Sequence, residues 1–198
     1  MFELSDSPQH YPACCLSISR QLFQIIEDVV LQIRANKHDH ISIFSIGCGT
    51  GFLEEKLMSF LHDQGLADVE IRGVEVLRAE VPHLDDHLVR RVRGATDVLD
   101  EAREADLLIF VYPRKGSLVR SYLDQIDSRV SVVLWLGPRA DWAEQQPDLL
   151  DSPNFDLPKP MSGDFLAPYE VAVLFENSVS LNHLGNLLLL HTASLNSG

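Results

Sequence analysis

The chain has 198 residues, of which 45% are hydrophobic and 23% charged, a composition typical of a globular protein with one core. Its formal net charge of −13 argues against a nucleic-acid partner, because proteins bind the phosphate backbone through Lys and Arg. The three cysteines, Cys14, Cys15 and Cys48, do not have the pattern of a disulfide framework and favour a reducing, cytoplasmic location. No apolar run reaches the roughly 18 residues of a membrane-spanning helix, so we expect no membrane partner.

Residues 1–14 are predicted to form an irregular N-terminal arm, because two prolines interrupt any helical pattern. Apolar residues then recur at helical spacing over 16–35, which predicts the first helix. His10 and Tyr11 lie in the arm just before this helix. They belong either to a solvated segment or to a cover over a ligand site.

The segment 41–57, ISIFSIGCGTGFLEEKL, combines an apolar run, three glycines and a helical pattern of leucines. It predicts a buried strand, a tight turn and a helix. Gly47, Gly49 and Gly51 leave almost no side-chain bulk in the turn, so a ligand can lie against the backbone. Phe52 stands where a dinucleotide fingerprint has its last glycine, and no P-loop lysine follows, so both of those motifs are excluded.

This strand, Gly-x-Gly-x-Gly turn and helix resemble the first motif of the Rossmann-like (class I) S-adenosylmethionine-dependent methyltransferases, in which GCGTG is a common form. The resemblance implies that S-adenosylmethionine binds at the three glycines and Cys48. It also implies a role for the residue two positions before the first glycine. That residue is usually Asp or Glu and helps to hold the amino group of the methionine moiety, but it is Ser45 in this chain.

A second strand is predicted over 69–76, with Glu75 near its end. A carboxylate at this point accepts hydrogen bonds from ribose hydroxyls in nucleotide-binding α/β folds. We therefore predict that Glu75 and Val76 bind the cofactor, with a simple surface carboxylate as the alternative. After a third strand over 88–92, the resemblance places Thr96 near adenine, whereas Asp97 either reaches adenine or caps a helix from about residue 98.

His83 and His87 are four residues apart, a spacing that puts two metal ligands on one helical face. No third ligand is evident at a suitable spacing, and Pro82 interrupts the segment. We therefore predict a solvated segment and no metal site.

Two further strands are predicted over 106–112 and 130–136, and ligands of open α/β sheets bind beyond the carboxyl ends of such strands. Tyr112 ends the first of them and is predicted to contact the cofactor and to take part in catalysis. Arg114 and Arg139 follow the two strands and are predicted to hold an anionic substrate, unless they are exposed loop residues. The sequence at Tyr112 is not the Asn-Pro-Pro-Tyr of amino-methylating members, which argues against nucleobase or amide nitrogen as the acceptor.

The segment 141–168 contains five prolines and is predicted to be either a lid on the substrate side or a packed crossover. Within this proposal Trp142, together with Tyr11 of the arm, contacts the substrate. Strands are then expected over 169–175 and 187–191. Their link is too short for a helical crossover, so the two should be antiparallel.

The sequence therefore predicts one domain over 1–198 with an α/β, three-layer, Rossmann-like methyltransferase fold. Its seven-stranded sheet should be mostly parallel, with an antiparallel last strand. The predicted function is S-adenosylmethionine-dependent methyl transfer to an oxygen or carboxylate of a small molecule. A hydroxyl acceptor needs a general base, for which His10, Tyr112 and Glu176 are the candidates by position.

The alternative is a methyltransferase-like protein without methyl transfer, acting as a binding subunit or using the pocket for other chemistry. Ser45 in place of the usual acid favours this alternative. Because no separate substrate domain is predicted, a second copy of the chain or a partner protein is a further expected contributor to the pocket.

Overall fold

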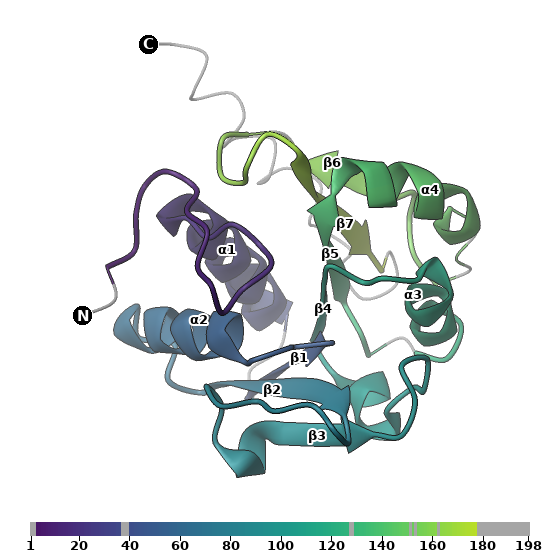
Figure 1. Cartoon of the computed structure of the whole chain (residues 1–198), viewed down its shortest axis with the longest axis horizontal. Helices are drawn as coiled ribbons and strands as arrows, with labels where there is room; N and C mark the ends of the chain where they lie inside the picture. Colours follow the sequence, from purple (N-terminus) through teal and green to yellow (C-terminus); the bar gives the residue numbers. More distant parts are fainter. Residues whose placement is uncertain are drawn as a thin grey trace.

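The computed structural model describes residues 3–36, 40–126, 129–150, 152, 154–161 and 163–177. A seven-stranded sheet runs through the centre, with α1 and α2 on one face and α3 and α4 on the other (Figure 1). The strands are β1 Ile41–Ile46, β2 Val69–Val76, β3 Val89–Val92, β4 Leu107–Val111, β5 Val132–Pro138, β6 Lys159–Met161 and β7 Glu170–Glu176. The helices are α1 Arg20–Asn36, α2 Phe52–Asp63, α3 Gly116–Leu123 and α4 Arg139–Leu149, with short 3-10 helices η1 Asp86–Leu88 and η2 Asp100–Glu104.

The strands lie in the order β3-β2-β1-β4-β5-β7-β6. Strands β1 to β5 pair in parallel, and β7 is antiparallel to both of its neighbours, β5 and β6. The mostly parallel seven-stranded sheet with an antiparallel last strand is therefore confirmed.

Three details of the strand assignment differ from the prediction. The antiparallel strand is β7 itself, which the sequence analysis took as the strand before the last one. Strand β6 comes from the segment 141–168, which was predicted to be a lid or a crossover and ends by adding an edge strand to the sheet. The predicted strand 187–191 lies outside the described residues.

Side-chain alternation along β1 divides the core into two layers. Ile41 and Ile43 pack with the apolar faces of α1 and α2. Phe44 and Ile46 face the opposite side and pack with the residues of α3 and α4. Ser45 follows Ile43 by two positions, so its side chain points toward α1 and α2.

The carboxyl ends of β1 and β4 lie side by side where the strand order reverses, which is the position at which open α/β sheets bind ligands. The reversed direction of β7 brings its first residue to this same edge. Glu170 pairs with Pro138 at the end of β5, whereas Glu176 pairs with Val132 at the start of β5. The edge formed by the ends of β1, β2, β4 and β5 and the start of β7 is called the carboxyl edge below.

The helices predicted over 16–35 and after the glycine turn are confirmed as α1 and α2, with shifted ends. The start of the segment 141–168 is helical, because α4 begins at Arg139, directly after β5. The helix predicted from about residue 98 is replaced by the 3-10 helix η2, whose cap is Leu99. Asp97 is not its cap, because the carboxylate accepts a hydrogen bond from the Gly94 N–H at 2.8 Å instead. Within the described part of the chain, the helices are too short or too polar to cross a membrane.

Candidate active site

The glycine turn between β1 and α2 is built from left-handed backbone. Gly47, Gly49 and Gly51 have φ angles of 77°, 57° and 78°, a region that L side chains rarely adopt. Within the described structure, a Cβ added to Gly47 or Gly49 would meet no atom within 4 Å, so the backbone there faces open space. A Cβ on Gly51 would lie 2.9 Å or less from Val81 and Leu84. The first two glycines thus leave room for a ligand, and the third makes room for the protein's own packing.

Glu75 places a carboxylate against this turn from the end of β2. Its Oε2 accepts a hydrogen bond from the Gly49 N–H at 3.0 Å, and its Oε1 accepts one from the Val76 N–H at 2.8 Å. The side chain is half-buried. The structure brings Glu75 and the glycines together, as expected from the sequence, and the contact of Glu75 with ribose stays a prediction.

Cys48 and Thr96, which the resemblance assigns to the cofactor, lie in different surroundings. The Cys48 side chain is buried against Val81, Leu84 and Leu88, and its sulfur lies against Gly73 of β2. Only the backbone of Cys48 is therefore part of the turn's exposed face. Thr96 is exposed in the loop after β3.

A second carboxylate, which the sequence analysis did not single out, lies behind the turn. Glu54 in the first turn of α2 is 2% exposed, and its Oε1 accepts a hydrogen bond from Ser45 Oγ at 2.5 Å. Burial raises the pKa of Glu54 to about 7, although the hydrogen bond from Ser45 acts in the opposite direction. The signal in the sequence was a charged residue on the apolar face of α2 that carries Leu57 and Leu61.

The N-terminal arm covers the turn and the start of α2 (Figure 1). Thr50 Oγ1 donates a hydrogen bond to the carbonyl of Ala13 at 2.6 Å, and the rings of Tyr11 and Phe52 lie 5.4 Å apart. An isolated β-bridge between Gln9 and Ile18 closes the arm into a loop. The irregular arm is thus a packed cover rather than a solvated tail.

Glu170 at the start of β7 fixes the arm to the sheet, and sequence reasoning missed it. Its Oε1 accepts hydrogen bonds from Tyr112 Oη at 2.5 Å and from the Ser17 N–H at 3.1 Å. Its Oε2 accepts from Ser17 Oγ and from the Ala167 N–H. At 1% exposure, Glu170 is a buried junction between the arm, the end of β4 and β7.

Tyr112 has the backbone strain that often marks a functional site. Its φ of 51° is the single positive φ of a non-glycine residue in the described part of the chain. Burial and the hydrogen bond to Glu170 raise the pKa of Tyr112 above its usual value. Its phenol therefore stays protonated at neutral pH and donates to Glu170, which argues against Tyr112 as a general base.

Three polar residues meet at the far end of the carboxyl edge. His10 of the arm and Tyr169 lie 2.6 Å apart between Nε2 and Oη, with their rings stacked at 5.9 Å. Arg139 donates its backbone N–H to the Tyr169 carbonyl and its Nε–H to the Pro168 carbonyl at 2.9 Å. Two predicted residues, His10 and Arg139, thus both contact Tyr169, which was not predicted. Arg114 is exposed in the loop after β4.

Two predicted site residues lie elsewhere. Glu176 is buried at the opposite edge of the sheet, paired with Lys159, because β7 is antiparallel and its last residue lies beside the start of β5. Its candidacy as a catalytic residue was therefore wrong. Trp142 is 6% exposed and packs on Trp135 and Phe175, so it is a core residue of α4 rather than a substrate contact.

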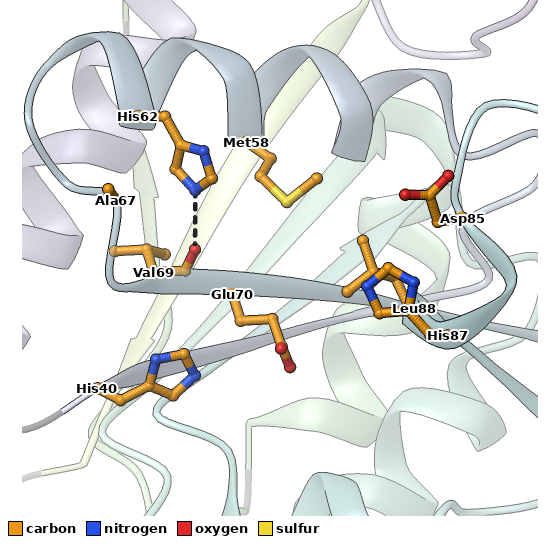
Figure 2. Close-up of a pocket in the computed structure, with 9 residues that line it drawn as sticks. All are labelled: His40, Met58, His62, Ala67, Val69, Glu70, Asp85, His87 and Leu88. Carbon is orange, nitrogen blue, oxygen red and sulfur yellow. Dashed lines mark hydrogen bonds between the residues drawn. The ribbon is translucent and has the colours of Figure 1, made fainter.

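A separate pocket of about 310 Å³ lies between α2 and β2, away from the glycine turn (Figure 2). Its polar lining includes His40, His62, His87, Glu70 and Asp85. Figure 2 shows the three histidines on different elements, with His62 turned toward the backbone oxygen of Val69. No group of three metal-ligating side chains is found among the described residues.

No family model and no curated protein matches the chain. Solved structures do resemble it. A human methyltransferase 10 domain-containing protein gives a TM-score of 0.52 at 14% identity, over 80% of this chain and 82% of that chain. The bifunctional kinase-methyltransferase WbdD gives 0.52 at 15% identity, over 80% of this chain and 39% of that chain. The small RNA methyltransferase HEN1 gives 0.50 at 11% identity, over 88% of this chain and 28% of that chain.

The chain thus spans less than half of the length of the last two proteins. At these identities the likeness concerns the fold and does not extend to activity. It agrees with the strand order and with the antiparallel β7. The chain therefore has the Rossmann-like fold of the class I S-adenosylmethionine-dependent methyltransferases.

Proposed function

We propose that the protein binds S-adenosylmethionine and transfers its methyl group to an oxygen nucleophile, a hydroxyl or a carboxylate, of a small molecule. The observation that carries the proposal is the open glycine turn with the Glu75 carboxylate held 3.0 Å from the Gly49 N–H. This arrangement lies at the ligand-binding edge of a methyltransferase fold.

The residues present fit the cofactor. Gly47 and Gly49 offer backbone without side chains in front of it, and Glu75 offers carboxylate oxygens to the ribose hydroxyls. When bound, the cofactor supplies a methyl group on a sulfonium, which is already activated for transfer. The work left to the protein is to hold the nucleophile in line and to exclude water, and orientation alone can lower a barrier by about 7–11 kcal/mol. The arm, packed on the turn through Thr50 and Tyr11, provides the cover.

The substrate side of the proposal is built from His10, Tyr169 and Arg139. A hydroxyl acceptor needs a base, and His10, held by Tyr169, is the candidate of suitable chemistry at this edge. The charge of Arg139 favours an acceptor that carries a carboxylate or a phosphate, and Arg114 adds a second exposed cation after β4. A carboxylate acceptor would need no base at all.

Calorimetric titration with S-adenosylmethionine and S-adenosylhomocysteine tests the cofactor part. We expect micromolar binding to the wild-type protein. Glu75→Ala should weaken it by a factor of about ten or more, since a charge-assisted hydrogen bond contributes roughly 1.5–3 kcal/mol. Glu80→Ala removes an exposed acid nearby and serves as the matched control. No binding at millimolar ligand refutes the proposal, and equal affinity in Glu75→Ala removes the assignment of Glu75.

Methyl transfer is then assayed with methyl-labelled cofactor and pools of small hydroxy acids and phenols. For a hydroxyl acceptor, His10→Ala should lower kcat by about 10²–10⁴-fold, the usual contribution of a general base. Arg139→Ala should raise KM for an anionic acceptor and leave cofactor affinity unchanged. A His10→Ala variant with full kcat would exclude His10 as the base.

A second candidate function is supported by Ser45, which replaces the acid expected at the end of β1. In this case the protein uses the fold to bind a ligand or a protein partner and transfers no methyl group. The two functions differ in one result. Cofactor binding without labelled product from any pool supports the second, and labelled product supports the first.

A further inference from the structure

The structure contains a buried carboxylate whose bonding is incomplete. Glu54 Oε1 accepts the hydrogen bond from Ser45, but Glu54 Oε2 has no hydrogen-bond partner among the described residues. Buried polar atoms are almost always paired, because an unpaired buried acceptor loses its water without compensation. An unpaired oxygen on a carboxylate is costlier still, since burial opposes its charge.

The place of Glu54 links this oxygen to the proposed cofactor cleft. Glu54 follows the glycine turn by three residues, and its partner Ser45 precedes the turn by two. The charge of Glu54 acts on the pKa of Cys14 in the arm and of Cys48 in the turn, and the charge of Glu75 in β2 acts on the pKa of Glu54, so all three residues lie close to it. The carboxylate is thus enclosed by the arm, the turn and the end of β2, the elements that surround the open face of the turn.

Among the described residues, the charge that acts on the pKa of Glu54 is negative, not positive. The neighbour whose charge acts on the pKa of Glu54 is Glu75, a second acid, and the two cysteines are also groups that can only become negative. A buried carboxylate in such a place is stabilised by a ligand that brings both a positive charge and N–H donors. A primary ammonium group has three N–H donors and satisfies both needs. A sulfonium brings charge but no donor.

We propose that Glu54 binds the primary ammonium of the ligand's α-amino-acid moiety, with Ser45 holding Oε1 so that Oε2 is left for the ligand. The carboxylate of Glu54 in α2 would then take the role that the resemblance assigns to an acid at position 45 of β1, where this chain has a serine. This inference rests on the proposed function, because S-adenosylmethionine is the ligand that would bring such an ammonium into the cleft. It concerns a residue, Glu54, that neither the glycine turn nor Glu75 implies.

The test compares two ligands that differ in the amino-acid moiety. S-adenosylhomocysteine carries the ammonium and no sulfonium, whereas 5′-methylthioadenosine carries the nucleoside alone. Titration calorimetry at pH 8 should show that Glu54→Gln binds S-adenosylhomocysteine 10- to 100-fold more weakly than the wild-type protein. Its affinity for 5′-methylthioadenosine should stay within twofold. Asp63→Asn, which changes an exposed acid at the end of α2, should alter neither affinity.

A double variant, Ser45→Glu with Glu54→Ser, returns the carboxylate to the strand and keeps the hydroxyl as its partner. We expect it to recover at least part of the affinity for S-adenosylhomocysteine that Glu54→Gln loses, with thermal melting as the check on folding. This recovery distinguishes a charge in the cleft from a merely structural role of Glu54.

The other outcomes overturn the inference in distinguishable ways. Unchanged affinity for S-adenosylhomocysteine in Glu54→Gln, or an equal loss for both ligands, shows that Glu54 does not bind the ammonium. The inference is also overturned if the wild-type protein binds 5′-methylthioadenosine as tightly as S-adenosylhomocysteine. That result would still support a site for the nucleoside. A wild-type protein that binds neither ligand refutes the proposed function, and the inference with it.

Discussion

The pH dependence of folding provides a direct test of the buried state of Glu54. Burial raises the pKa of this carboxyl group from 4.5 to about 7. The folded protein therefore binds the proton more tightly than the unfolded chain, and stability falls as the pH rises from about 4.5 to about 7. Since one pKa unit corresponds to about 1.4 kcal/mol, ionised Glu54 lowers the free energy of unfolding by about 3 kcal/mol above pH 7.

The measurement is urea unfolding of the wild-type protein and Glu54→Gln at pH 5 and pH 8. Glutamine keeps an oxygen that can accept the hydrogen bond from Ser45, but it cannot ionise. Relative to the wild-type protein, the variant should therefore gain about 2–3 kcal/mol between the two pH values. The titratable groups around Glu54, namely Cys14, Cys48 and Glu75, are common to both proteins and largely cancel in the difference.

Asp63→Asn is the control, because Asp63 is an exposed acid at the end of the same helix, and its difference from the wild-type protein should change far less between the two pH values than that of Glu54→Gln. The reasoning is refuted if Glu54→Gln shows the same difference at pH 5 and pH 8. That result would mean that Glu54 is hydrated in the folded protein, and it would also remove the unpaired buried oxygen on which the ammonium site depends.

Three further predictions test the packing around the carboxyl edge and in the core. Glu170→Ala should lower the free energy of unfolding by about 3 kcal/mol or more in urea, because Ser17, Tyr112 and Ala167 lose a buried acceptor. Chymotrypsin should also cleave the arm faster, for example after Tyr11, and an unchanged cleavage rate would contradict the role of Glu170 in holding the arm. Gly51→Ala should lower the free energy of unfolding, measured by thermal unfolding, by about 1–3 kcal/mol more than Gly49→Ala, because a Cβ at position 49 meets no neighbour. The reverse order would contradict the geometry of the turn. Trp142→Ala should lower the free energy of unfolding in urea by about 3–5 kcal/mol, because it truncates a core side chain, whereas Arg114→Ala should change it by no more than about 0.5 kcal/mol. A small effect of Trp142→Ala would contradict the burial of Trp142 in the core.

The parts of the fold that sequence reasoning predicted well are those whose signal is local. The strand, glycine turn and helix over 41–63 follow one another without a gap, and their apolar periodicities are distinct. The direction of β7 has no such signal, because side chains alternate with the same period in parallel and antiparallel strands. This explains why Glu176 was placed at the site and Glu170 was overlooked, since reversing a strand exchanges its two ends.

The candidate site also contains parts with a local signal in the sequence and parts without one. That Gly47, Gly49 and Glu75 lie close together could be predicted, because each lies at the end of a strand that could itself be predicted. The link between Ser17 and Glu170 spans 153 positions of sequence, so no local pattern could have indicated it. The prediction that Trp142 contacts the substrate failed for another reason. Because α4 begins at Arg139, Trp142 lies within the helix on its buried face.

The attachment of the arm to β7 has a consequence for the order in which the protein becomes complete. Ser17 and His10 contact residues 153 and 159 positions later in the chain. During synthesis the arm and the glycine turn are made early, but their partners at Tyr169 and Glu170 are among the last described residues to be translated. Long-range contacts of this kind form late, because closing so large a loop costs entropy before any contact is gained.

We therefore expect refolding to build the sheet first and to seat the arm afterwards. Pulse-labelled hydrogen exchange would show the Gln9 and Ile18 amides, which bond to each other's carbonyls, gaining protection after those of β1 and β4. Simultaneous protection would contradict this order. The open face of the glycine turn would then be accessible to ligand throughout assembly, so a ligand could bind before the arm covers the turn.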